Sequence, residues 1–299
     1  MKYYITANAY CRRIFGRKVY KLALSAARTC PNRDGTVGTG GCSFCSAGGS
    51  GDFAAPAELP VAEQITRAKE LLGEKGNGLA YIAYFQSFTG THGDLDRLEA
   101  IYREAAAQPD IVGLSIATRP DCLGETALAM LERLSHLTTL WVELGLQTVH
   151  ERTAELINRC YPLECYERAA EKLHALNIHT ITHIILGLPG ESREEMLASV
   201  RYAGEHSDGV KLQLLHVLRG THLAESYERG EFETLELDGY CELVADALEL
   251  LPERTVIHRL TGDGAKRDLI APLWSGDKKR VLAELNRTLR RRGLAPAEV

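Results

Sequence analysis

The chain has 299 residues and a formal net charge of −5, and it is 45% hydrophobic and 25% charged, which is ordinary usage for a globular protein. A chain of this length buries about three quarters of its unfolded surface, enough for one large domain or a domain with an appendage. No apolar run reaches the roughly 18 residues that a membrane span needs, so a membrane protein is excluded.

The N-terminus lacks the apolar run of a secretory signal, and eight cysteines in a chain of this length do not suggest a disulfide scaffold. We therefore expect a cytoplasmic protein with no membrane partner.

The first strand is predicted at residues 19–25, and it runs directly into a loop at residues 29–53 that holds Cys30, Cys42 and Cys45 among seven glycines. Glycines let the backbone fold tightly around a compact object. Three thiolates are one short of a closed zinc site, and they suit a four-iron four-sulfur cluster with one iron left open. Half of a zinc site, a thiol redox pair and simple packing are the alternatives.

Alternating helices and strands follow the cysteine loop. Apolar periodicity predicts helices at 60–73, 94–106 and 124–137 and strands at 79–85, 111–117, 140–147, 180–186, 209–216 and 255–259. Capping-box patterns at Thr148–Glu151 and Ser192–Glu195 predict that helices begin just after the strands 140–147 and 180–186.

The strand 140–147 has two different faces. Glu143 and Gln147 share one face, and Leu144 and Leu146 share the other. A strand covered by helices turns its apolar face toward them, so we expect Glu143 and Gln147 to point into the interior of a barrel.

At least six strand–helix units in succession predict an α/β fold with a parallel sheet closed fully or partly into a barrel, with the site at the C-terminal ends of the strands. We divide the chain into an N-terminal lead at 1–18, a core barrel at 19–252 and a C-terminal extension at 253–299 that holds the last strand and a basic helix.

Both ends of the chain are rich in basic residues. The basic residues near the N-terminus are Arg12, Arg13, Arg17, Lys18, Lys21, Arg28 and Arg33, and those of the last helix are Lys278, Lys279, Arg280, Arg287, Arg290, Arg291 and Arg292. They are either solvated faces or a shared surface for a polyanion.

The motifs resemble those of the radical S-adenosylmethionine (SAM) superfamily, most closely the YhcC-like proteins and more distantly the radical SAM domain of the Elongator catalytic subunit. The resemblance rests on Cys30-x11-Cys42-x2-Cys45, Tyr84-Phe-Gln-Ser, Ala117-Thr-Arg-Pro-Asp121, Glu143-Leu-Gly-Leu-Gln147 and Leu186-Gly-Leu-Pro-Gly190. It implies a partial or near-complete TIM-type barrel of the radical SAM type, with a short C-terminal helical extension. It also implies a [4Fe-4S] cluster held by the three cysteines, and SAM on the open iron.

The same resemblance implies the residues that contact SAM. By position at the strand ends these are Gln86 and Ser87, Arg119, Glu143, Gln147, His183, Gly187 and Pro189. Arg119 is expected to pair with the SAM carboxylate, while Gln86 and Ser87 stand where relatives carry Gly-Gly-Glu. The alternatives are that Glu143 only balances Lys211 or Arg259, and that His183 is a core histidine. No catalytic hydrogen-handling residue is predicted.

Cys122, Cys160 and Cys165 are interpreted as packing residues and not as ligands of a second cluster.

Three functions remain open. The first is a radical SAM enzyme that modifies an RNA, specifically a tRNA base, bound through the basic termini and supplied with electrons by a flavodoxin or ferredoxin. The second is the same chemistry on a small metabolite or peptide. The third is a zinc-stabilised binding protein.

Overall fold

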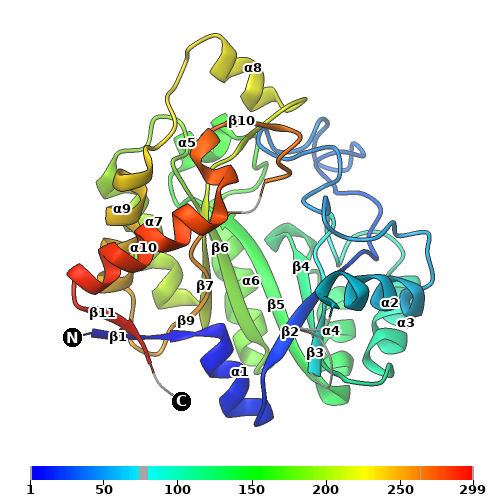
Figure 1. Cartoon of the computed structure of the whole chain (residues 1–299). Coiled ribbons are helices and arrows are strands. Elements are labelled where there is room, and N and C mark those ends of the chain that lie inside the picture. The colour runs from blue at the N-terminus through cyan, green and yellow to red at the C-terminus, as the bar shows by residue number, and fades with distance from the viewer. Residues whose placement is uncertain (1, 74–79, 263, 298–299) are drawn as a thin grey trace.

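One curved sheet of parallel strands organises the protein (Figure 1). The computed structural model describes residues 2–73, 80–262 and 264–297. In spatial order the nine strands of these residues are β11 (Leu294–Pro296), β1 (Lys2–Thr6), β9 (Val256–Arg259), β7 (Gly209–Leu214), β6 (His179–Leu186), β5 (Thr139–Gln147), β4 (Ile111–Thr118), β3 (Ala80–Phe85) and β2 (Val19–Leu24). The expected α/β fold with a partial barrel is confirmed.

A second, two-stranded antiparallel sheet pairs β8 (Val217–Leu218) with β10 (Leu269–Ala271) beyond the end of β7. Leu79, where the sequence predicts that β3 begins, lies outside the described residues.

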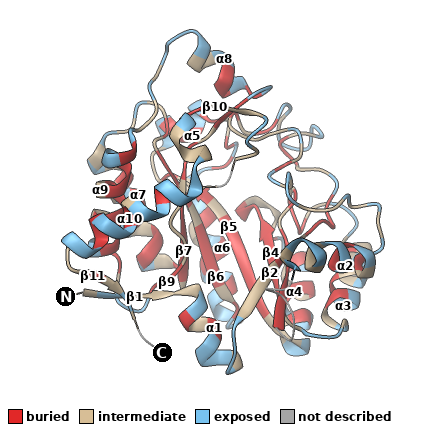
Figure 2. Cartoon of the chain, in the orientation of Figure 1, coloured by how far each residue is buried: buried red, intermediate tan, exposed pale blue. Residues whose placement is uncertain are grey.

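Helices surround the large sheet, and most of them pack on its outer face. They are α1 (Ala7–Phe15), α2 (Val61–Leu72), α3 (Leu95–Ala106), α4 (Glu125–Leu137), α5 (Glu151–Leu156), α6 (Leu163–Ala175), α7 (Arg193–His206), α8 (His222–Glu228), α9 (Leu237–Leu250) and α10 (Lys278–Arg291), with short 3-10 turns η2 (Pro120–Cys122) and η3 (Leu273–Gly276). Each long helix buries an apolar stripe and leaves a polar face to solvent, as Figure 2 shows. None of the helices in the described ranges is both long and apolar enough to cross a bilayer.

The N-terminal lead contains a strand and a helix that the sequence analysis did not predict. Strand β1 lies between β9 and β11, and α1 begins at Thr6, whose side chain accepts a hydrogen bond from the amide of Ala9. The Tyr10 hydroxyl lies 3.1 Å from Nδ1 of His179, the first residue of β6. Helix α1 therefore covers the N-terminal ends of the strands, at the end of the barrel away from the cysteine loop (Figure 1).

Of the two predicted capping boxes, only one is present. Ser192 and Glu195 form the reciprocal pair that begins α7. The prediction at Thr148 is wrong, because α5 begins after His150 without a side-chain cap. Thr148 is fully buried, and its hydroxyl donates to the Glu191 carboxylate at 2.5 Å and accepts from the amide of His150 at 3.1 Å, so it closes a turn before the helix and bonds to no amide of the first helical turn.

Gly90 tests the packing that supports the strand ends. A Cβ at Gly90 would lie 2.6 Å from Ile116 Cγ2 and 2.9 Å from the Ala117 carbonyl oxygen. We expect Gly90→Ala to lower the free energy of unfolding by about 1–3 kcal/mol, since the rigid neighbours must shift. Urea denaturation measures this.

The control is Gly239→Ala, at an exposed position in α9 with no atom within 4 Å of the new Cβ. This change is expected to raise stability by up to about 1 kcal/mol, through helix propensity. Equal effects of the two substitutions would contradict the packing at Gly90.

Candidate functional site

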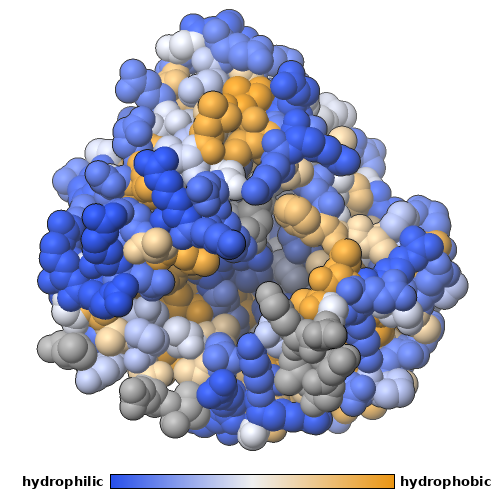
Figure 3. All heavy atoms as spheres, in the orientation of Figure 1, coloured by the Kyte–Doolittle hydropathy of each residue, from blue (hydrophilic) through white to orange (hydrophobic). Residues whose placement is uncertain are grey.

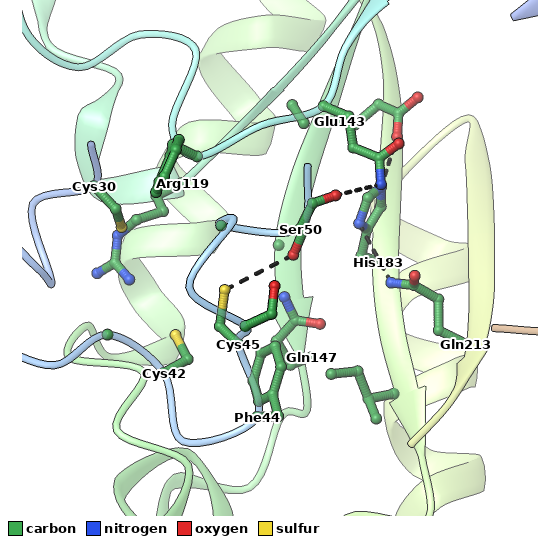
Figure 4. Close-up of a pocket in the computed structure, with 18 of the residues that line it drawn as sticks. Cys30, Cys42, Phe44, Cys45, Ser50, Arg119, Glu143, Gln147, His183 and Gln213 are labelled. Carbon is green, nitrogen blue, oxygen red and sulfur yellow. Dashed lines mark hydrogen bonds and ion pairs between the residues drawn. The ribbon is translucent and has the colours of Figure 1, made fainter. Parts of the chain in front are cut away.

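A cavity of about 220 Å³ opens at the C-terminal ends of the strands. It is lined by all three cysteines of the loop and by Gln86, Arg119, Glu143, Gln147 and His183. Figure 4 shows the cysteines on one side of this cavity and Glu143, His183 and Gln213 on the other. The structure thus brings together eight of the eleven residues that the sequence places in the site.

Ser87, Gly187 and Pro189 are not among the lining residues. Gly187 adopts a φ of 93°, and its amide donates to Met196 Sδ at 3.0 Å, so this glycine shapes the turn after β6.

Two asparagines and one arginine hold the cysteine loop. The fully buried Asn32 donates through Nδ2 to the Asn158 carbonyl at 2.6 Å, and Asn158 donates back to the Gly41 carbonyl at 2.8 Å. Arg33 donates to the carbonyls of Cys45 and Ser46 at 3.0 and 2.6 Å. The sequence analysis missed these roles because Asn158 is 126 residues from Asn32 along the chain.

Gln86 and Ser87 also support the loop. Gln86 Nε2 donates to the Ser50 carbonyl at 2.6 Å, and the Ser87 hydroxyl lies 2.7 Å from that of Ser25. A Cβ at Gly51 would lie 2.1 Å from Ser87 Oγ, which explains why the loop approaches β3 through a glycine.

The guanidinium group of Arg119 already has partners within the protein. Its Nε and Nη2 donate to the two carboxylate oxygens of Asp121 at 2.9 and 2.7 Å, and the guanidinium lies 4.9 Å from the centre of the Tyr161 ring. The expected pairing with a ligand carboxylate therefore competes with a bidentate pair already present.

Glu143 is the centre of a buried polar network. It accepts from Lys21 Nζ at 2.6 Å, Ser115 Oγ at 2.6 Å and His183 Nε2 at 2.7 Å, and it also pairs with Lys211. Burial alone would raise the pKa of this fully buried carboxyl group, but Lys21 and Lys211 hold the pKa well below its usual range. Glu143 therefore balances Lys211, which the sequence analysis named as its alternative role.

His183 is a neutral imidazole. Burial and the nearby Lys211 lower its pKa to about 4, so Nε2 carries the proton that it donates to Glu143. Its Nδ1 lies 3.5 Å from Gln213 Nε2 and accepts a hydrogen bond from it.

Gln147 ends β5 with an unusual backbone and an unused acceptor. Its φ is 70°, at a register shift between Gly145 and Gln147. Its Oε1 is buried and has no hydrogen-bond partner in the described structure. A buried acceptor at a cavity wall costs free energy unless a ligand donates to it, so this atom fits a bound ligand.

The three cysteines suit an inorganic group larger than one ion. No three His, Cys, Asp or Glu side chains of the described residues are placed to hold a single metal ion. Cys30, Cys42 and Cys45 nevertheless line one cavity, as thiolates around a four-iron cluster do. Burial and the neighbouring Cys45 raise the pKa of Cys42 to about 12, and a bound metal would favour its thiolate.

Two family models match the chain. The Radical SAM superfamily model covers residues 27–203, and the Radical_SAM C-terminal domain model covers residues 207–291.

The chain is 46% identical to YtqA of Bacillus subtilis and 35% identical to YhcC of Escherichia coli. These matches cover 98% and 94% of this chain and 91% of each relative. It is also 31% identical to a tRNA uridine(34) acetyltransferase of Dehalococcoides mccartyi, over 57% of this chain and 37% of that protein.

Among solved structures, the archaeal Elp3 of Methanocaldococcus infernus superposes with a TM-score of 0.68 at 18% identity. The superposition covers 93% of this chain and 64% of that one, and it shows a common fold.

Because His183 is neutral in the folded protein, we expect the stability of the protein to depend on pH. Between about pH 6.5 and 4 the unfolded imidazole binds a proton that the folded one does not, so stability falls as the pH falls. We expect His183→Gln to reduce this loss by about 1.4 kcal/mol per pH unit, measured by urea denaturation across that range.

His136→Gln, at an exposed position, serves as the control. If the His183 variant and the parent lost stability with the same slope, the neutral assignment would be wrong.

Proposed function

Because the chain belongs to the radical SAM superfamily, we propose that it is an enzyme that cleaves SAM reductively and acts on a tRNA base. Members of this superfamily are enzymes that bind a [4Fe-4S] cluster and SAM. The single observation that carries the proposal is the arrangement of Cys30, Cys42 and Cys45 on one wall of a cavity whose other wall is polar.

The three cysteines would hold the cluster and leave one iron open, because a fourth cysteine does not line the cavity. A cluster bound there would, when reduced, supply the electron for reductive cleavage of SAM to methionine and a deoxyadenosyl radical. A flavodoxin or ferredoxin would donate that electron.

The roles of the site residues divide into two groups. Gln147 would contact SAM directly, since its buried Oε1 lacks a donor. Gln86, Ser87 and Arg119 would act by positioning the cysteine loop and its surroundings, since their polar groups already have protein partners.

A tRNA substrate is favoured by the relatives named for it. The Dehalococcoides protein is a tRNA uridine(34) acetyltransferase, and its similarity to this chain extends over 57% of the residues. A tRNA base would have to leave its stack to enter the cavity, as enzymes that react with bases require. The same chemistry on a small metabolite or peptide is the second candidate.

We do not assign the RNA contacts to the basic termini. The exposed Arg12 and Arg17 belong to the α1 end of the barrel, away from the cavity. In the last helix Arg287 pairs with Glu284, and Arg291 pairs with Glu242 of α9, so much of that charge is balanced. Figure 3 shows hydrophilic surface over both α10, at the left, and α1, at the bottom, as separate areas.

Exposed basic residues also follow the C-terminal ends of two strands. Arg219 comes after β8, and Lys266 and Arg267 come after β9, close in the chain to Gly264, which lines the cavity. Arg267 also has an acidic partner, Asp268, at 3.1 Å. RNA phosphates would reach these residues while a base enters the cavity, so it is their position that makes them the better candidates for RNA contacts.

The cluster proposal predicts the iron content of cysteine variants. Replacing Cys30, Cys42 and Cys45 together by alanine should remove nearly all iron and sulfide from anaerobically reconstituted protein, because no thiolates remain in the cavity. The control replaces Cys160 and Cys165, which do not line the cavity, and should keep both. Retention of iron by the first variant and its loss from the second would assign the cluster to other cysteines. Stoichiometric zinc without sulfide in the parent would favour the zinc-stabilised binding protein over the enzyme.

The RNA proposal predicts which basic residues matter. Lys266→Glu with Arg267→Glu should weaken binding of bulk tRNA at least tenfold at low salt, because two phosphate contacts become repulsive. Arg12→Glu with Arg17→Glu makes the same charge change at the far end of the barrel and should alter binding by less than twofold. Filter binding at several salt concentrations measures both variants. Absence of tRNA binding by the parent would favour the small metabolite or peptide.

A further inference from the structure

The side-chain amide of Asn32 lies between the cysteine loop and the segment that follows α5. Asn32 is fully buried, and its Nδ2 donates to the Asn158 carbonyl at 2.6 Å. An amide nitrogen carries two protons, so one N–H remains after this bond. The Sγ atom of Cys42 lies 3.7 Å from Nδ2 and accepts a hydrogen bond from it. One buried amide thus joins a backbone carbonyl to one of the three cysteines.

The orientation of this amide is fixed by its neighbours. A carbonyl oxygen only accepts hydrogen bonds, so the atom of Asn32 that faces the Asn158 carbonyl must be the nitrogen. The other end of the amide, Oδ1, lies 3.2 Å from Sγ of Cys160, whose thiol can donate to it. A Cβ at Gly38 would lie 2.3 Å from the same Oδ1, so the loop backbone closes over the amide and leaves it little room to turn.

The segment that carries Asn158 is itself bonded to the cysteine loop. The amide of Ser43 donates to the Ile157 carbonyl at 2.9 Å, and Asn158 Nδ2 donates to the Gly41 carbonyl at 2.8 Å. Asn158 has a φ of 54°, which is an uncommon backbone conformation for a residue other than glycine. The chain adopts this conformation where it presents a carbonyl to the amide that contacts Cys42, which suggests that the arrangement has a role.

Cys45 has a different kind of neighbour. Its Sγ lies 3.9 Å from the hydroxyl of Ser50, which is exposed and can turn to water instead (Figure 4). No surface of Asn32 is exposed, so water does not compete for its amide. The contact from Asn32 to Cys42 is therefore the better fixed of the two.

We propose that Asn32 is a positioning residue that acts through Cys42, and that its hydrogen bond to the sulfur raises the reduction potential of the cluster. This rests on the proposed function, because it concerns the cluster that the three cysteines would hold. Sulfur ligands become more negative when a cluster is reduced, so a fixed N–H donor stabilises the reduced form more than the oxidised form. A higher potential makes the cluster easier for its electron donor to reduce.

The test measures the reduction potential of reconstituted protein without SAM, by electron paramagnetic resonance during a titration with dithionite and redox mediators. Asn32→Leu replaces the amide by an apolar group of similar size. It should shift the equilibrium about tenfold toward the oxidised cluster, which lowers the potential by about 59 mV for one electron. An unchanged potential in this variant would overturn the proposal.

The matched control is Asn158→Gly. It removes the bond to the Gly41 carbonyl and so weakens the anchoring of the same loop, but it keeps the backbone carbonyl that Asn32 contacts. Glycine readily adopts the positive φ of this position, so the control should change the equilibrium by less than about twofold. Equal shifts in the two variants would mean that loop anchoring, and not the hydrogen bond to sulfur, sets the potential, and would overturn the proposal.

A second measurement needs no variant at position 32. The side-chain amides of asparagine are labelled with nitrogen-15, and the reduced protein is examined by pulsed electron paramagnetic resonance. A nitrogen that is hydrogen-bonded to a sulfur ligand receives unpaired spin from the cluster. We therefore expect a nitrogen-15 coupling in the parent and in Asn158→Gly. Its absence from the parent would overturn the proposal, even if Asn32→Leu assembles no cluster.

Iron, sulfide and deoxyadenosine separate this inference from the proposed function. A parent with full iron and sulfide and the same potential as Asn32→Leu would overturn the inference and leave the proposed function intact. A shifted potential in a protein that forms no deoxyadenosine from SAM would support the inference while the proposed function fails. A parent that takes up neither iron nor sulfide would overturn both.

Discussion

The buried carboxylate of Glu143 is the interaction on which the barrel interior depends. It joins β5 to groups from four other strands: Lys21 of β2, Ser115 of β4, His183 of β6 and Lys211 of β7. Removing one partner from a buried ion pair typically costs about 3–5 kcal/mol, so these contacts hold the strands in one arrangement. Against the effect of burial, the two lysines lower the pKa of Glu143, and burial together with Lys211 lowers the pKa of His183.

The cysteine loop at the open end of the cavity is held by a different set of interactions. The cysteine loop has few apolar side chains to bury, and it is held by polar contacts from distant segments, through Asn32, Arg33 and Asn158. Its glycines let it approach β3 closely, as at Gly51. A loop held in this way presents thiols at defined positions before any inorganic group binds, which reduces the entropy lost on binding.

The parts that the sequence predicts well are those with a local physical signal. Alternation along residues 140–147 placed Glu143 and Gln147 in the interior, and strand–helix alternation predicted the parallel sheet. The C-terminal ends of parallel strands meet at one edge, so motifs far apart in the sequence were expected at one site. The division of the chain into lead, core and extension remains a prediction.

The features that the sequence analysis missed or predicted wrongly have two causes. One is a short segment without a clear apolar period, and the other is contacts between residues far apart in the chain. Helix α1 has only nine residues and buries only Ala9 and Cys11, too few for a clear period. The pattern at Thr148 matched a capping box, but its hydroxyl donates to Glu191, 43 residues away, and accepts from the amide of His150, which precedes the helix. The pairing of Arg291 with Glu242 joins residues 49 apart, so the sequence showed a basic helix without the acids that face it.

The central claim is that the cysteine cavity supports reductive cleavage of SAM. The most direct measurement incubates reconstituted protein anaerobically with SAM and dithionite and quantifies deoxyadenosine and methionine by mass spectrometry. We expect equal amounts of the two products from the parent and neither above background from Cys42→Ala. A parent with full iron and sulfide that forms no deoxyadenosine, although it binds SAM, would contradict the account.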